Sequence, residues 1–282
     1  MSERGTEVRA RVGTMNELAE VLGAMRGMAA ARIQQGERAR AAAQEYAARI
    51  GAALASLDAD APARPPAAPT RPPRTLVVAL CTERGFVGGL NERVVRAAEA
   101  SPPPREILIV GARGLSFARE RGLSVTYAGD MPTHVGGLGD VADQIGDRLV
   151  ERMNDGELVV VDVIHPRRTP AGGTVVERQR LLPRELLPRP TSPGYPPLTM
   201  LPAPVLAAQI ALEYLHAQLV AFAAESFAAA NAASLEVLQA AHAHLDDMLV
   251  AARRTQNAMR QEEITAEVLE VITGRLTGAS KT

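Results

Sequence analysis

The sequence predicts an α/β protein in which long N- and C-terminal helices form an antiparallel coiled coil and a central domain carries a mostly parallel sheet. Both ends of the chain are rich in Ala and place apolar residues at helical spacing. The middle instead alternates short β-branched runs with helical runs, which is typical of a parallel sheet. Aromatic residues make up 3% of the 282 residues, which is low for one large core.

The N-terminal coiled-coil helix is expected over residues 1–58. Apolar side chains recur at helical spacing from Val8 to Ala29, and Ala-rich sequence continues to about Leu57. A Pro-rich linker, residues 59–74, follows and ends the helix, because Pro lacks a backbone donor and restricts the residue before it. A single helix of this kind cannot bury its apolar stripe alone, so it needs a helical partner.

Residues 75–187 are expected to form a Rossmann-like α/β domain with a mostly parallel sheet. The expected strands are 75–80, 106–110, 124–127 and 157–164, and the expected helices are 89–100, 115–121 and 138–153. A further strand, 174–181, follows a Gly-containing turn and predicts an antiparallel hairpin at one edge. A second Pro-rich linker, residues 188–204, ends the domain.

The C-terminal coiled-coil helix is expected over residues 205–282, and its apolar pattern changes near its end. The seam alternates spacings of three and four residues, through Leu235, Leu238, Leu245, Leu249, Ala252 and Met259. The stripe then resumes out of phase at Ile264, Val268 and Val271. This shift leaves Asn257, Arg260, Gln261 and Thr265 to face a surface other than the helix partner.

Charge and cysteine content exclude several classes of protein. The 31 basic and 32 acidic residues nearly cancel, so no global field attracts nucleic acid or anionic lipid. The single Cys81 cannot form an internal disulfide, and we expect it to be a small buried residue at a strand end. We expect neither a secretory leader nor an apolar run of transmembrane length, hence a reducing cytoplasm and no direct membrane insertion.

Three features resemble parts of an active site, but each has a simpler interpretation. The Gly-rich turn in residues 81–91 follows a strand and opens a helix, yet it lacks a Lys to reach a phosphate and matches no nucleotide fingerprint. The turn in residues 136–140 is expected to be a loop and helix start. The five histidines form no ligand-like combination: His134, His165, His216, His242 and His244. We expect no catalytic residue, metal or cofactor.

Several segments, in order along nearly the whole chain, resemble the gamma subunit of F-type ATP synthases. Residues 82–91, Thr-Glu-Arg-Gly-Phe-Val-Gly-Gly-Leu-Asn, resemble the family's Ser-Asp-Arg-Gly-Leu-Cys-Gly-Gly-Leu-Asn, and residues 111–122 resemble its second-strand exit. Met25 stands where the family has Ala-Met before a helical run of small residues. Arg260, Gln261, Thr265 and Glu267 belong to its Arg-Gln-x-x-Ile-Thr-x-Glu pattern.

The resemblance implies a central-stalk rotor subunit that mechanically couples ion flow through the membrane sector to ATP synthesis or hydrolysis in the alpha/beta catalytic ring. It implies contacts with the alpha, beta and epsilon subunits and the c-ring, at the cytoplasmic side of a bacterial membrane as a peripheral protein. The catalytic residues belong to the ring. By match, Arg260, Gln261 and Thr265 would engage a beta-subunit loop, and Glu267, the last residue of the motif, is a further partner-contact residue. Asn257 supports that face, and Met25 with Arg26 lies near the beta-subunit lever.

Departures from the family pattern and two other functions stay open at this point. Glu17 and Glu20 replace neutral or basic character, and Val87 replaces the family's Cys, as in a divergent member or a specialised second ATPase that could use sodium. A non-catalytic coiled-coil scaffold would explain the long helices but not the cluster around Arg260. A nucleotide-binding regulatory α/β protein would explain the glycine turn but not the terminal helices.

Overall fold

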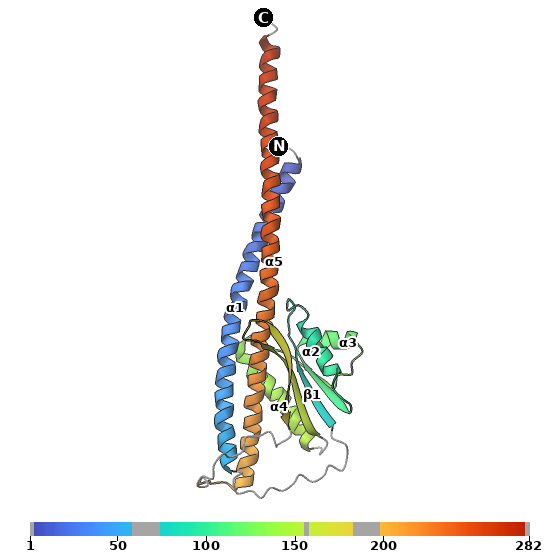
Figure 1. The fold of residues 1–282 in the computed structure, drawn as a ribbon, viewed down its shortest axis with the longest axis vertical. Coiled ribbons are helices and arrows are strands. Elements are labelled where there is room, and N and C mark those ends of the chain that lie inside the picture. Colours follow the sequence, from blue (N-terminus) through green and yellow to red (C-terminus); the bar gives the residue numbers. More distant parts are fainter. Residues whose placement is uncertain (1–2, 58–73, 155–157, 183–197, 280–282) are drawn as a thin grey trace. The chain divides into compact units, whose positions relative to one another are not determined.

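The computed structural model describes residues 3–57, 74–154, 158–182 and 198–279 (Figure 1). Two long helices, α1 (Glu3–Leu57) and α5 (Ala203–Ala279), enclose the central elements in sequence. The two expected Pro-rich linkers fall mostly outside the described residues. The chain divides into a helix-pair unit, residues 1–28 with 236–282, and a domain unit, residues 29–235. Both α1 and α5 contribute residues to each unit.

The domain unit contains a five-stranded sheet in the order β3-β2-β1-β4-β5. Its strands are β1 (Arg74–Leu80), β2 (Arg105–Val110), β3 (Tyr127–Gly129), β4 (Leu158–Arg168) and β5 (Thr174–Leu182). The first four are mutually parallel. β5 pairs antiparallel with β4, so the expected edge hairpin is confirmed, as is a mostly parallel sheet.

One strand lies later than the sequence pattern indicates. The apolar run expected at residues 124–127 is replaced by β3 at Tyr127–Gly129. Leu123 and Val125 pack against the core from the preceding loop, which explains why their apolar character mimics a strand. Pairing with β2 begins only at Tyr127, opposite Leu108.

Helices cover both faces of the sheet, as parallel strands require. α2 (Leu90–Glu99) and α3 (Ala112–Glu120) pack on one face, where Val77 and Ala79 point. A short 3-10 helix (Val135–Gly137) leads into α4 (Leu138–Asn154), which packs with α5 on the other face, where Val78 and Leu80 point (Figure 1). The alternation along β1 therefore divides its side chains between two cores.

Within the domain unit, α1 and α5 approach closely and run antiparallel. A Cβ atom placed on Gly36 would lie 3.0 Å from the Cβ atom of Ala228, so only glycine fits there without movement of its neighbours. Further along α1, the Tyr46 hydroxyl donates to Glu213 Oε1 at 2.8 Å. Small side chains thus set a helix spacing that larger ones would widen.

The helix-pair unit has its own small apolar cluster. Val12 and Met15 of α1 bury against Leu245 and Leu249 of α5. Beside this cluster, the Arg253 guanidinium donates to Asn16 Oδ1 at 3.0 Å. These contacts follow the seam expected from the sequence and confirm the long terminal helices.

α5 differs from the sequence-based expectation in one respect. Over Ala203–Leu269 it is long and apolar enough to pass a length and composition test for a membrane span, although no run of this kind was expected. Core helices of other proteins pass the same test, and Leu219, Ala223 and Ala224 of α5 lie in the domain core. The abundant Ala explains the result, so α5 gives only weak evidence for a span.

Candidate interaction surfaces

The residues expected to contact a partner near the chain's end are exposed on α5. Asn257, Arg260, Gln261, Thr265 and Glu267 are all exposed in the helix-pair unit. Asn257, Gln261, Ile264 and Val268 follow one another at spacings of four and three, which places them on one side of the helix. The predicted polar residues therefore share a face with apolar ones.

That face continues beyond the buried seam as an exposed apolar surface. Leu249 is 6% exposed, whereas the following large apolar residues are about half exposed: Ile264 48%, Val268 51%, Leu269 57% and Ile272 50%. Exposed apolar residues that gather on one surface mark interaction sites more often than scattered ones. We call Asn257, Arg260, Gln261, Thr265 and Glu267 with these four apolar residues the tip surface.

A hollow of about 320 Å³ borders the tip surface within the helix-pair unit. It is lined by Gly5 and Arg9 of α1 and by Gln256, Asn257, Met259, Arg260 and Glu263 of α5. Gln261 and Thr265 do not line it; the Thr265 hydroxyl donates to the backbone oxygen of Gln261 at 2.8 Å. Asn257 and Arg260 thus line this hollow together with residues of α1, while Gln261, Thr265 and Glu267 lie outside it.

Met25 and Arg26 belong to a separate surface of the same unit. Gly5 of α1 lies near the Arg260 region, and Asn16 already meets Arg253, so Met25 lies farther from the tip surface along α1. Both side chains are half-buried, and the Arg26 Nε atom is buried without a hydrogen-bond partner among the described residues. Three exposed apolar residues flank them at helical spacing: Leu18, Val21 and Met28.

The Gly-rich turn after β1 is held by buried hydrogen bonds. Asn91 Oδ1 accepts from the Thr82 backbone N–H at 2.9 Å, and Asn91 Nδ2 donates to Thr82 Oγ1 at 2.8 Å. Glu83 Oε2 accepts from the backbone N–H of Ala112 at 3.1 Å, at the start of α3. A carboxylate therefore occupies a helix start where an anionic ligand would otherwise bind.

This turn also packs against α5. It carries an exposed aromatic residue that was not predicted from the sequence. Leu90 and Val87 bury against Ala233 of α5. Immediately before Val87, Phe86 is 68% exposed and adopts a φ of 60°. An apolar residue with positive φ is uncommon outside functional or strained turns. A Phe inside a glycine-rich turn was the available signal.

His134, His216 and His242 have local structural partners, and Cys81 is buried. His216 Nε2 lies 3.0 Å from Asp143 Oδ1, and His242 Nδ1 lies 3.0 Å from Asp246 Oδ2. The His134 ring accepts from the Gly137 N–H. Among the described residues, no group of three His, Cys, Asp or Glu side chains could hold a metal ion. Cys81 is buried at the end of β1, as expected, and burial raises its pKa to about 12.

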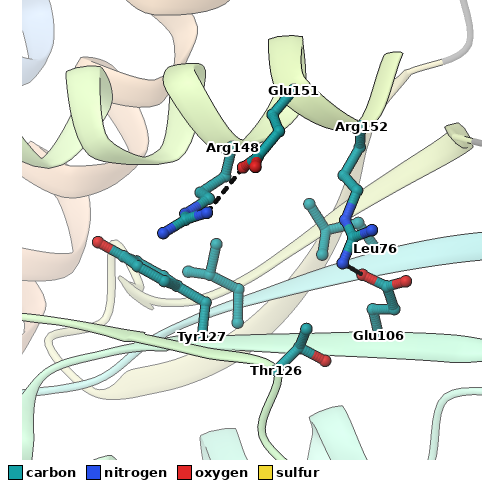
Figure 2. A pocket seen from close by; sticks show the side chains of 8 residues that line it. Leu76, Glu106, Thr126, Tyr127, Arg148, Glu151 and Arg152 are labelled. Carbon is teal, nitrogen blue, oxygen red and sulfur yellow. Dashed lines mark hydrogen bonds and ion pairs between the residues drawn. The ribbon is translucent and has the colours of Figure 1, made fainter. Parts of the chain in front are cut away.

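A hollow of about 170 Å³ lies between α4 and strands β2 and β3 (Figure 2). Arg148 extends over the Tyr127 ring at 4.6 Å and donates to Glu151 at 2.7 Å. Arg152 forms an ion pair with Glu106 at 3.0 Å. Because each arginine faces a glutamate, the hollow offers no excess positive charge to a phosphate.

Comparison with known proteins identifies the family to which this chain belongs. A family model described as ATP synthase matches residues 4–276. The chain belongs to this ATP synthase family. Relatives named ATP synthase gamma chain are 26% identical in Phenylobacterium zucineum, over 95% of this chain and 97% of the relative, and 28% identical in Fuscovulum blasticum, over the same shares. The gamma-subunit resemblance of the sequence is thereby confirmed.

Solved ATP synthase structures share the fold of this family member. A chain of the Euglena gracilis mitochondrial ATP synthase OSCP/F1/c-ring structure superposes with a TM-score of 0.59 and 15% identity, covering 99% of this chain and 96% of the other. A chain of the Tetrahymena thermophila mitochondrial central stalk/c-ring structure gives 0.57 and 18%, covering 78% and 99%. At these identities the likeness concerns the fold.

Proposed function

We propose that the chain works as the central-stalk rotor subunit of an F-type ATP synthase, coupling ion flow to ATP synthesis or hydrolysis in the catalytic ring. The match of the family model to residues 4–276 carries this proposal. The architecture supports it, because two antiparallel helices pack along a shared seam and α5 continues into an exposed mixed surface. In this proposal the chain acts through mechanical contact with the subunits of the catalytic ring.

The tip surface is the part proposed to meet the ring. Its apolar residues stay about half exposed in the free chain, so burying them in a sleeve of partner subunits would be favourable at about 25 cal/mol per Å². Arg260 adds a planar donor for charge-assisted hydrogen bonds with a beta-subunit loop, and Gln261 and Thr265 lie beside it. Asn257 and Glu267 complete the polar rim.

Met25 and Arg26 are proposed as a second contact, near the beta-subunit lever. Their distance along α1 from the tip surface means that the two contacts meet the ring at different depths. The Arg26 side chain is half-buried, and its guanidinium offers a carboxylate of the ring a charged hydrogen-bond donor. The exposed Leu18, Val21 and Met28 would supply apolar area beside it.

The α/β domain is proposed to bind the epsilon subunit and to stand on the c-ring, at the cytoplasmic side of a bacterial membrane. The family's place in complexes that contain a c-ring supports this arrangement, since one structural relative is a central stalk with a c-ring. The residues of this chain that would form those contacts are not among the predicted sites.

Replacement of Arg260, Gln261 and Thr265 together by alanine tests the proposed ring contact. We expect near-normal melting of the free chain, because the three side chains are exposed, and reduced assembly or reduced ATP-driven ion pumping. Native gels measure assembly, and pumping in vesicles measures coupling. Thr255→Ala is the matched control, because Thr255 is exposed on the opposite side of α5 from Asn257 and Ile264 and, like Thr265, donates its hydroxyl to the preceding helical turn. Full assembly and coupling in the triple variant would show that these residues are only solvated.

The nucleotide-binding alternative has its own measurement. We expect no tight binding of ATP to the purified chain, because Glu83 occupies the start of α3 and the glycine turn lacks a Lys. Calorimetry that found micromolar affinity, lost on substitution of Gly88 or Gly89, would favour a regulatory nucleotide site instead.

A further inference from the structure

A fully buried histidine lies between the sheet and α5, and the proposed rotor function does not use it. His165 is on β4 and is 0% exposed. Its ring centroid lies 4.9 Å from that of Phe222 on α5, with the two planes tilted by 40°. Phe222 belongs to the core that joins α5 to the sheet. Any change in the charge of His165 therefore acts directly on this contact layer.

The ring of His165 is poorly supplied with hydrogen-bond partners. Nδ1 lies 3.4 Å from the Pro166 oxygen and 3.8 Å from Glu225 Oε2 on α5, the latter beyond hydrogen-bond reach. Nε2 is buried with no partner among the described residues, and so is the hydroxyl of Ser226, the residue after Glu225. A protonated imidazole needs acceptors for two N–H groups, and this layer does not provide them.

Most of the charged groups near His165 form hydrogen bonds or ion pairs with one another. Glu177, its neighbour across the hairpin on β5, accepts from Arg167 at 2.6 and 2.9 Å. On α1, Glu37 pairs with Arg40 at 3.1 Å and with Arg168 of β4 at 3.3 Å. The Glu225 carboxylate accepts no hydrogen bond from a side chain among the described residues, and it lies near Arg40 and Arg167. With neutral His165 these three arginines and three glutamates sum to zero.

Burial decides which form of His165 the fold prefers. Desolvation lowers the pKa of His165 to about 4, and although Glu177 acts in the opposite direction, its effect is smaller. Burial also raises the pKa of Glu225, which therefore gains a proton more easily on acidification and becomes a weaker partner for a charged imidazole. The nearby carboxylate does not rescue a protonated ring in this layer.

We propose that His165, with Phe222 and Glu225, forms an acid-sensitive contact between β4 and α5. Protonation of His165 places a positive charge in a buried contact layer that lacks acceptors for both ring N–H groups, and the packing of α5 residues 215–233 on the sheet weakens. The contact lies in the domain unit, away from the tip surface in sequence. Its response to pH is therefore independent of the proposed contacts with the ring. It makes the attachment of α5 to its own domain depend on pH.

The direction with pH follows from the lowered pKa. The unfolded chain binds a proton at His165 below about 6.5, the ordinary value, whereas the folded chain resists it until about 4. Stability from this site is therefore complete above about pH 6.5 and is lost as pH falls towards 4. Glu225 acts in the opposite sense, because a raised carboxyl pKa favours the folded state on acidification.

Hydrogen exchange of the full chain between pH 7 and 4.5, corrected for intrinsic rates, tests the proposal. In the wild type we expect protection of residues 215–233 to fall by on the order of 100-fold towards the acid end, more than in His165→Gln, which cannot become charged. His216→Gln is the matched control, because His216 also faces a carboxylate, at 3.0 Å, yet its side chain is 37% exposed. We expect it to behave like the wild type.

Two measurements keep the test decisive if His165→Gln folds poorly. Histidine ring titration by NMR in the wild type should show the His165 ring still neutral at pH 5. In Glu225→Gln the acid sensitivity should persist, since His165 carries it. A His165 that titrates at pH 6 or above, equal losses in wild type and His165→Gln, or loss of the acid effect in Glu225→Gln would each overturn the proposal.

Discussion

The two units of this chain bury their residues in different ways. In the domain unit the sheet places Val77, Val78 and Ile109 at 0% exposure between helical layers on both faces. In the helix-pair unit the buried cluster is a single narrow seam around Met15 and Leu249, at 8% and 6% exposure. A seam one side chain wide buries little area per residue, so we expect the domain to hold the chain's stability and the helix pair to gain much of its order from partners.

Cys81 gives the largest expected contrast, because it reports on the domain alone. Burial raises its pKa to about 12, so at pH 8 its thiolate fraction is roughly 1,000-fold below that of an ordinary thiol with a pKa of 9. Labelling by a thiol reagent should therefore proceed only through opening of the domain. Rapid labelling of the native chain, at the rate of the urea-unfolded chain, would remove the contrast between the units.

Loss of a core side chain should be felt most in the domain. Ile109→Ala removes a residue of β2 at 0% exposure, in the core cluster that includes residues of α2 and α3, and we expect a loss of about 2–5 kcal/mol in the free energy of unfolding by urea. Val175→Ala on edge strand β5, where the side chain is 37% exposed, should stay within about 0.5 kcal/mol. Similar losses in both variants would mean that the sheet is not the stable part.

The same kind of truncation in the helix pair should have a smaller and more local effect. Leu249→Ala opens the seam beside Val12 and Met15, and we expect about 2 kcal/mol, the low end for such changes, because the two helices can close around the gap. Hydrogen exchange should already be fast in the free wild type over residues 8–25 and 259–276, and the variant should extend that region. Uniform strong protection there would contradict the proposed division.

The smallest expected effect is on the free chain carrying Arg260→Ala. The side chain is exposed and Ala is a better helix former, so we expect the free energy of unfolding to change by no more than about 0.5 kcal/mol. The melting temperature should shift correspondingly little. In the assembled complex the same change should cost on the order of 2–5 kcal/mol if Arg260 is desolvated against the ring. Measuring both in parallel shows whether the tip surface contributes only through partners.

Sequence patterns located most elements because each depends on neighbours in the chain. Helical spacing placed the end of α1 at Leu57, and β-branched runs placed β1 and β2 to within a residue of their starts. β3 was misplaced because Val125 packs against the core from a loop, and apolar character alone does not separate these cases. The tip residues were proposed from a family motif, and their exposure is compatible with that proposal without testing it.

What the sequence determined by itself was the kind of protein: two long Ala-rich helices, a parallel sheet between them, and a gamma-subunit motif around Arg260. Contacts and burial that depend on residues far apart in the chain were decided only by the tertiary structure. In the tertiary structure the Glu83 carboxylate lies at the start of α3, and Phe86 is exposed on the turn after β1. His165 is buried beside Phe222 and near Glu225. The physical reason is that periodicity records which side of an element is apolar, whereas burial and charge depend on residues far apart in the chain.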